Sequence, residues 1–326
     1  MPSPATPTVR LYTDRRMLEH RPAPRHPERP ERLAAILRHL DRTGLDRQCE
    51  PGDVRPATDA ELLRVHTPAH LSRVASMEQA GGGLIEADTW VSHGSDLGAR
   101  LAAGAIIGAV GDVLEGHARR AFCAVRPPGH HARPDDPMGF CLYSGVAVAA
   151  ADALARLGLS RILVVDWDVH HGNGTQEIFY DDPRVGFFSV HRHPFYPGTG
   201  SRDETGTGPG LGFTRNLPLA YGIGRADYLA AFRQDLSDFA ERFRPELILI
   251  SAGFDAHAAD PVGSLGLEVE DFEVLTREIL DLADVHAGGR VVSVLEGGYN
   301  VPILAGCVEA HLRILIDHGG AREVTT

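Results

Sequence analysis

Short runs of apolar residues recur along the chain, and each run ends abruptly in polar residues. The run Ile162–Val165 has four consecutive apolar residues, which is typical of a strand buried on both faces of a parallel sheet. Similar runs lie at Val9–Tyr12, Ala121–Val125, Val185–Val190, Leu247–Ile250 and Val291–Leu295. We predict a strand at each of these positions.

Helical patterns precede and separate these runs. Residues His26–Leu40 indicate a turn leading into an amphipathic helix, on which Arg29 and Arg32 are expected to be solvated charges. Glu61–Glu78 indicates a second helix. It carries His66 and His70, which are four residues apart. Both are expected at the helix surface or in a structural role.

The segment Asp96–Leu114 predicts a long helix, with Ser95 as its N-cap. Its many Ala and Gly residues imply close packing against a sheet or another helix. The repeated order of strand, polar loop and helix predicts an α/β fold with a mostly parallel sheet between helical layers. We find no linker, so residues 1–326 are predicted to form a single domain.

The most informative stretch is RILVVDWDVHHGNG, from Arg161 to Gly174. If the strand continues past Val165, Asp166, Asp168 and His170 point to one side with a period of two. Carboxylate oxygen and imidazole nitrogen suit Zn²⁺, and a catalytic zinc site takes three protein ligands. A strand that ends in Asp or His is also ordinary, so this stretch alone does not establish a site.

Other strand ends supply further chemistry. His130 and His131 follow one run in RPPGHH, Asp255 follows another in SAGFD, and Tyr299 follows the last in EGGYN. In open α/β sheets, ligands bind outside the carboxyl ends of the strands. Metal ligands, imidazole bases and a phenol at one edge together predict a hydrolytic site.

Composition excludes some functions. The chain of 326 residues carries a formal charge of −12, which disfavours nucleic acid and favours cationic substrates such as polybasic protein tails and polyamines. Mean hydropathy is −0.14, and no unbroken apolar run reaches membrane length, so no membrane partner is expected. The N-terminus does not look like a signal peptide, which favours a cytoplasmic enzyme. The four cysteines are scattered and indicate neither a zinc knuckle nor disulfides.

The segments RPPGHH, GFC, DWDVHHGNGTQ, PGTG, SAGFDAH and LEGGYN resemble the zinc-dependent histone deacetylase superfamily, specifically its class II-like branch with many prokaryotic members. The resemblance covers residues 26–315 or so. It implies a three-layer α/β/α arginase-like deacetylase fold with about eight mostly parallel strands. It also implies a deacetylase that uses one catalytic Zn²⁺.

The resemblance assigns roles to individual residues. The implied zinc ligands are Asp168, His170 and Asp255, which supplies the third ligand. The implied catalytic residues are His131 as general base and acid, held by Asn173, and His130 as its electrostatic neighbour, held by Asp166. Tyr299 is the implied oxyanion donor. Family members of class I usually have Asp where this chain has Asn173, so Asn favours class II.

Substrate contacts are also implied. Phe140 and Tyr196 match the two aromatic walls of the acetyl-lysine tunnel, and Gly298, beside Tyr299, is expected to contact substrate. Asp88 is either a rim acid that anchors the substrate backbone or a solvated aspartate. The family also commonly holds a structural K⁺ through the backbone oxygens of Asp166, Asp168 and His170 and through Ser189.

The predicted function is removal of acetyl or other acyl groups from Nε-acetyl-lysine in proteins or peptides. The alternative is an acetylpolyamine or other acetylated-amine amidohydrolase with the same zinc centre. The polyamine-selective branch has an acidic gatekeeper where this chain has Val262, which disfavours strong polyamine selection. A two-manganese ureohydrolase and a catalytically silent acetyl-lysine reader are disfavoured by the tandem histidines and the complete set of catalytic residues. Physiological substrate, acyl-chain preference, oligomeric state and the choice between Zn²⁺ and Fe²⁺ stay open.

Overall fold

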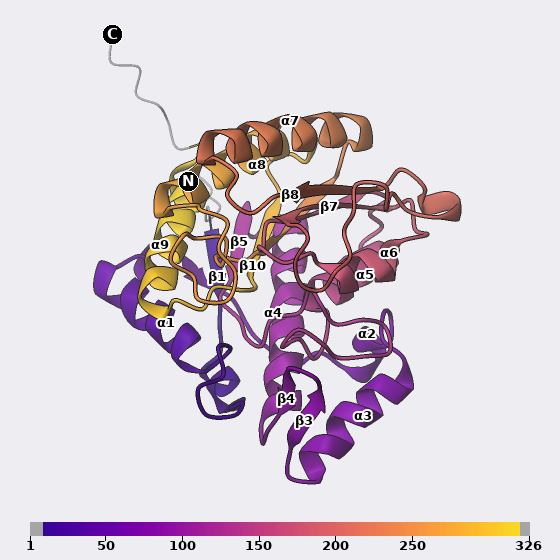
Figure 1. Cartoon of the computed structure of the whole chain (residues 1–326), viewed down its shortest axis with the longest axis vertical. Coiled ribbons are helices and arrows are strands. Elements are labelled where there is room, and N and C mark those ends of the chain that lie inside the picture. The colour runs from indigo at the N-terminus through magenta and orange to yellow at the C-terminus, as the bar shows by residue number, and fades with distance from the viewer. Residues whose placement is uncertain (1–8, 320–326) are drawn as a thin grey trace, which may run out of the picture.

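The structure is a computed structural model that describes residues 9–319 (Figure 1). These residues form a three-layer α/β/α arrangement around one large sheet, as the sequence predicts. The predicted domain of residues 1–326 includes 1–8 and 320–326, which lie outside the described residues.

The central sheet has eight strands, and all its neighbouring pairs are parallel. The strands stand in the order β2-β1-β5-β10-β9-β6-β7-β8. Their bounds are β1 (Val9–Tyr12), β2 (Glu50–Pro51), β5 (Arg120–Cys123), β6 (Ile162–Asp166), β7 (Val185–Arg192), β8 (Thr214–Leu219), β9 (Leu247–Ala252) and β10 (Val291–Leu295). Every strand predicted from the apolar runs is present. The side chains of β5, β6, β9 and β10 are buried throughout, as expected for strands covered on both faces.

Helices cover both faces of the sheet (Figure 1). One layer packs α1 against α9, α9 against α8 and α8 against α7; the other packs α4 against α5 and α5 against α6. The bounds are α1 (Glu31–Thr43), α4 (Ser95–Leu114), α5 (Gly145–Arg156), α6 (Asn173–Phe179), α7 (Arg225–Phe243), α8 (Val269–His286) and α9 (Val301–Asp317). Short 3₁₀ turns lie at Arg15–Glu19, Asp46–Gln48 and Gly208–Gly210.

The predicted helix Glu61–Glu78 is wrong as one element. The structure has α2 (Asp59–Leu62) and α3 (Pro68–Gln79), separated by a turn. Pro68 cannot donate a helical hydrogen bond and disfavours helical geometry in Thr67, which instead accepts from the backbone N–H of His70. Both histidines of this region are buried and structural, since His66 and His70 bond to backbone carbonyls of Arg133 and Leu142.

The long helix α4 begins one residue earlier than expected. Gly94 is its N-cap, and Ser95 is the first helical residue, with its hydroxyl accepting from the backbone N–H of Ser92. By length and hydropathy α4 alone among the helices of residues 9–319 could span a membrane, yet 67% of its most apolar window is buried. It contacts α5, β5 and β10, so it is a core helix that packs directly on the sheet.

A small antiparallel hairpin, β3 (Gly83–Glu86) and β4 (Thr89–Val91), lies beside α3 (Figure 1). The sequence patterns did not predict this hairpin. The hairpin places Asp88 in its turn, next to the loop that carries Phe140.

Candidate active site

The sheet order brings the polar loops together. Strands β5, β10, β9 and β6 are consecutive neighbours, so their carboxyl ends meet at one edge. Because all are parallel, the loops that follow them converge there, although up to 169 residues separate His130 from Tyr299. The convergence predicted from the sequence is therefore present.

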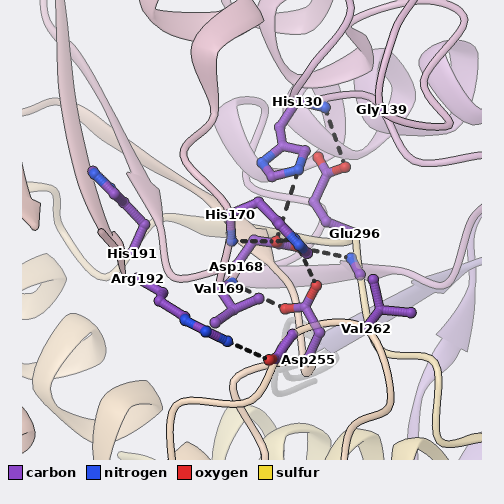
Figure 2. Close-up of polar contacts among 12 residues, drawn as sticks. His130, Gly139, Asp168, Val169, His170, His191, Arg192, Asp255, Val262 and Glu296 are labelled. Atoms are coloured by element: carbon purple, nitrogen blue, oxygen red, sulfur yellow. Dashed lines mark hydrogen bonds and ion pairs between the residues drawn. The ribbon is translucent and has the colours of Figure 1, made fainter. Parts of the chain in front are cut away.

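Asp168, His170 and Asp255 form one buried cluster. One ligand atom from each residue lies within 4.8 Å of the others. His170 Nδ1 lies 3.0 Å from Asp168 Oδ1 and 3.2 Å from Asp255 Oδ2, and Figure 2 shows the three side chains facing one another. The backbone N–H groups of Gly297 and Val169 donate to Asp168 Oδ2 and Asp255 Oδ1 at 2.8 and 2.9 Å. These bonds orient both carboxylates toward His170.

The cluster fits a zinc ion. Its donors are two carboxylates and one imidazole, and Asp255 Oδ2 accepts no hydrogen bond from any described residue although it is buried. Side chains at Gly253 and Gly297 would collide with these carboxylates, so the two glycines provide the space they occupy. Burial and the nearby Asp168 charge raise the pKa of Asp255 to about 7. Two buried carboxylates that repel each other favour a bound cation.

The tandem histidines each have the predicted partner. His130 Nδ1 lies 2.9 Å from Asp166 Oδ2, and His131 Nδ1 lies 2.7 Å from Asn173 Oδ1. Burial lowers the pKa of His130, but the charges of Asp166 and Asp168 outweigh it and raise that pKa to about 10. Burial lowers the pKa of His131 well below its usual range, and the His130 charge lowers it further. The pair therefore combines a protonated ring with a neutral one.

The hydrogen bond to Asn173 decides which nitrogen of His131 is free. An amide oxygen only accepts, so Nδ1 of His131 carries the proton and donates it to Asn173. The Asn173 amide nitrogen donates in turn to the sulfur of Met138, which is consistent with this orientation. Nε2 of His131 is left as a proton acceptor.

Tyr299 is held on a loop that turns through Gly298, where φ is +115°. The backbone N–H of Tyr299 donates to Asp260 Oδ2 at 2.6 Å, and the guanidinium carbon of Arg32 lies 4.9 Å from the centre of its ring. Burial raises the pKa of the Tyr299 hydroxyl well above its usual range, so the hydroxyl stays a hydrogen-bond donor.

These residues surround a cavity of about 240 Å³. Its lining residues are Asp88, His131, Gly139, Phe140, His170, Phe195, Tyr196, Val262 and Tyr299. The ring of Phe140 packs edge-on against Tyr299 at 5.7 Å, and that of Tyr196 packs edge-on against His131 at 5.2 Å. Both predicted aromatic walls therefore lie beside the predicted catalytic groups.

Asp88 and Gly298, both predicted to contact substrate, occupy different positions relative to the cavity. Asp88 lines the cavity and its Oδ1 accepts from the backbone N–H of Gly139 at 3.0 Å, so it is not a merely solvated aspartate. Gly298 is not among the residues that line the cavity, and its carbonyl accepts a hydrogen bond from Arg32 at 2.6 Å. This bond supports the Tyr299 loop, and the substrate contact of Gly298 stays a prediction.

Sequence reasoning missed a buried charge network beneath the site. Arg32, expected to be solvated, is fully buried and donates to the carbonyl groups of Glu296 and Gly298. Glu28 accepts two hydrogen bonds from Arg126, at 2.8 and 2.7 Å, and lies 3.5 Å from Arg32. The spacing of Glu28 and Arg32 by four residues was the available signal, although Glu28 precedes α1 and does not lie on it.

Glu296 and Asp260 were also missed, although Glu296 lies within the motif LEGGYN and Asp260 lies three residues after SAGFDAH. Glu296 accepts from the backbone N–H groups of Gly129 and His130, at 2.7 and 3.2 Å, and thereby fixes the histidine loop. Asp260 accepts hydrogen bonds from the backbone N–H groups of Val262 and Tyr299, and so connects the rim of the cavity to the Tyr299 loop. Phe195, which the sequence left without a role, lines the cavity and stacks on His170 at 5.3 Å.

Comparison with known proteins gives one consistent result. The family described as "Histone deacetylase domain" matches residues 26–315. The chain is 40% identical to "Histone deacetylase 15" of Arabidopsis thaliana, over 99% of this chain and 59% of that protein. It is 42% identical to the "Histone deacetylase-like amidohydrolase" of Pseudomonas aeruginosa, over 86% of this chain and 74% of that protein.

Two further similarities bear on the site. The chain is 46% identical to human "Polyamine deacetylase HDAC10", over 85% of this chain and 43% of that protein. The crystal structure of the HDA15 HD domain matches with a TM-score of 0.92 at 40% identity, covering 98% of this chain and 91% of that one. The chain spans little more than half of the plant relative and less than half of the human one. The three relatives are named as deacetylases or as a deacetylase-like amidohydrolase.

Proposed function

This chain belongs to the histone deacetylase domain family, and on that basis we propose that it is a zinc-dependent amidohydrolase acting on Nε-acetyl-lysine in proteins or peptides. The observation that supports this most is the position of the Asp168, His170 and Asp255 cluster. His170 itself lines the cavity of about 240 Å³, together with His131 and Tyr299. An acyl group in this cavity would therefore lie among a metal site, a base and a phenol.

Asp168, His170 and Asp255 would hold the zinc ion. When bound, zinc lowers the pKa of a coordinated water and polarises a carbonyl oxygen. His131 has the free Nε2 needed to take a proton from the attacking water. Its low pKa keeps it unprotonated at neutral pH, and its partner Asn173 holds the ring in place.

Tyr299 would stabilise the negative charge that develops on the substrate oxygen. Its hydroxyl stays protonated because burial raises its pKa, and the ring is held from both sides by Arg32 and Phe140. The protonated His131 then donates its proton to the leaving amine. His130, which donates to Asp166, keeps a positive charge beside His131 and favours the return of that proton.

Phe140 and Tyr196 would enclose the alkyl chain of the lysine. Gly139 is required here, since a side chain at this position would collide with the ring of His131. The backbone N–H of Phe140 donates to the Thr89 hydroxyl at 3.1 Å, which fixes the turn that presents its ring. Apolar walls with a polar end suit an acylated amine better than a free, charged amine.

A second candidate is an acetylpolyamine amidohydrolase with the same zinc centre. The name of the human relative, "Polyamine deacetylase HDAC10", favours it. Val262 argues against it, because this residue lines the cavity and carries no charge to attract a cationic polyamine.

The proposal includes three further parts. A structural K⁺ would be held by the backbone oxygens of Asp166, Asp168 and His170 and by Ser189, which pairs with Asp166 in the register of β6 and β7. The enzyme would be cytoplasmic. The substrate would be an acylated lysine or amine rather than nucleic acid or a membrane lipid.

The test is kcat/KM of zinc-loaded protein on an acetyl-lysine peptide and on an acetylated polyamine, side by side, with a chelator control. We expect faster, chelator-sensitive hydrolysis of the peptide. Faster turnover of the polyamine would assign the protein to small-molecule metabolism with the same mechanism. Turnover that survives complete metal removal would exclude the zinc mechanism.

A further inference from the structure

Arg192, at the end of β7, is clamped beside the active-site cavity. Its guanidinium carbon lies 4.0 Å from the ring centre of Phe195 and 4.3 Å from that of Tyr221. Its Nη1 donates to the carbonyl of Gly263 at 3.1 Å, and Figure 2 shows the side chain reaching toward the segment that carries Val262. Two aromatic faces and one carbonyl therefore fix the direction of this cation.

The charge of Arg192 is not neutralised by a carboxylate. No Asp or Glu among residues 9–319 lies within ion-pair distance of its guanidinium, and its Nε has no hydrogen-bond partner in that range. By contrast, neighbouring arginines such as Arg202 and Arg215 pair with Asp235. In a chain with a net charge of −12, Arg192 is thus an unpaired positive charge held in one place.

This charge lies next to the route that a substrate takes. Phe195, against which the guanidinium packs, lines the cavity, and its ring stacks on that of His170. Gly263, whose carbonyl accepts from Arg192, directly follows Val262, which also lines the cavity. Tyr221 is 68% exposed, so the outer end of the clamp faces solvent. Arg192 therefore marks the rim of the cavity on its Phe195 and Val262 side.

We propose that Arg192 is a specificity-determining residue that selects substrates by charge. It favours acyl-lysine sites with an acidic neighbour and disfavours substrates with a second cationic amine near the acylated one. This inference rests on the proposed function and narrows its substrate class. A charge at the rim acts on substrate side chains that come within the Debye length, which is about 8 Å at physiological salt.

Asp88 gives the rim a second, opposite charge. It is the carboxylate among the described lining residues, and it lies in the β3–β4 turn beside the Phe140 loop. Its Oδ1 already accepts from Gly139 and Thr89, at 3.0 and 2.9 Å, so part of its charge is committed to the protein. Within residues 9–319 Arg192 has no such carboxylate partner, so its charge is available to an acidic substrate side chain.

The experiment compares three acetyl-lysine peptides of equal length with Glu, Gln or Lys beside the acetyl-lysine. For the zinc-loaded wild-type protein we expect kcat/KM to fall in the order Glu, Gln, Lys, by about three- to tenfold overall, and to converge in 0.5 M salt. Arg192→Met should abolish the order. Arg192→Lys keeps the charge and should keep most of the difference in kcat/KM between the peptides. This variant therefore separates the effect of charge from that of packing.

Arg47→Met is the matched control, since it removes one positive charge from a side chain that is 65% exposed and outside the cavity lining. It should keep the wild-type order. An unchanged order in folded Arg192→Met, or an equal loss in Arg47→Met, would overturn the assignment.

Binding of the same peptides, followed by fluorescence anisotropy, tests Arg192 without turnover. If the wild-type protein hydrolyses no peptide but binds them in the order Glu, Gln, Lys, the proposed function fails and the role of Arg192 in charge selection stands. If it hydrolyses all three peptides at the same rate and binds them equally, the proposed function stands and the role of Arg192 fails.

Discussion

The base and the rim of the active-site cavity are built by different forces. At the base, Asp168 and Asp255 are buried and receive backbone hydrogen bonds, and His130 and His131 each have a side-chain partner. At the rim, Phe140, Tyr196 and Val262 are partly exposed and are held mainly by ring packing and by turns of the loops. The base is specified by hydrogen bonds to its functional side chains, and the rim by ring packing together with hydrogen bonds that fix its backbone.

This difference separates chemistry from selectivity. A buried polar group that loses its partner costs about 1–3 kcal/mol and more for a charge, so the base tolerates little change. Contacts at the rim are individually weak and screened by water, so its residues can vary without unfolding the protein. We expect substitutions at the base to remove activity and substitutions at the rim to redirect it.

The largest effect is expected for Asp255→Ala. Loss of one of three ligands should release zinc and reduce kcat/KM by about a thousandfold or more. Metal content by elemental analysis and peptide turnover check this. Asp238→Ala, which removes an exposed carboxylate of α7, is the control and should retain both. Stoichiometric zinc in Asp255→Ala would contradict its assignment as a ligand.

Tyr299→Phe should reduce kcat by about a hundredfold to a thousandfold while zinc stays bound, because only the oxyanion donor is removed. Its ring contacts with Phe140 and Arg32 remain, so KM should change little. Tyr221→Phe removes a hydroxyl from an exposed ring and serves as the control. Full activity in Tyr299→Phe would show that the hydroxyl has no role.

Val262→Glu tests the rim. A carboxylate in the cavity lining should raise kcat/KM for an acetylated polyamine relative to a peptide by about tenfold, since it attracts the second amine. Val262→Gln, which has the same shape without the charge, should leave the ratio near that of the wild type. If both variants shift the ratio equally, size and not charge decides selectivity at this position.

The smallest effect concerns the support beneath the base. His311 is buried between Thr276 and Ser293, and its ring packs against Trp167 at 5.5 Å. Burial lowers its pKa to about 3, so below pH 6.5 the unfolded chain binds a proton that the folded protein excludes. The free energy of unfolding should therefore decrease as the pH is lowered below 6.5, and this residue contributes up to about 1.4 kcal/mol per pH unit.

His311→Asn keeps a polar side chain that does not titrate. It should flatten the decline in the free energy of unfolding between pH 6.5 and pH 4, measured by urea denaturation, although it also lowers stability at pH 7. An unchanged slope would mean that His311 is protonated in the folded protein or that other groups dominate this pH range.

The sequence by itself determined six strands of the central sheet, the parallel α/β class and the residues at the strand ends, whereas β2 and β8 were not predicted. This worked because a buried parallel strand appears in the sequence as a local apolar run, and because Asp168 and His170 closely follow such a run. The strand itself ends at Asp166, so both residues lie in the bend after β6 and not on an extended segment. The resemblance supplied Asp255 as the third member of the cluster, and the sheet order places it there. Pro68 is a local signal for the break between α2 and α3, but the helix prediction did not use it.

Only the tertiary structure decided which charges are buried and which loops meet. Arg32 is bonded to Glu296, 264 residues away, and its spacing of four residues from Glu28 does not by itself distinguish a buried arginine from a solvated one. The clamp of Arg192 by Phe195 and Tyr221 likewise joins separate loops. The physical reason is that helical and strand periodicity report only which face of an element is buried. The partner that a buried polar group finds is set by the packing of distant segments.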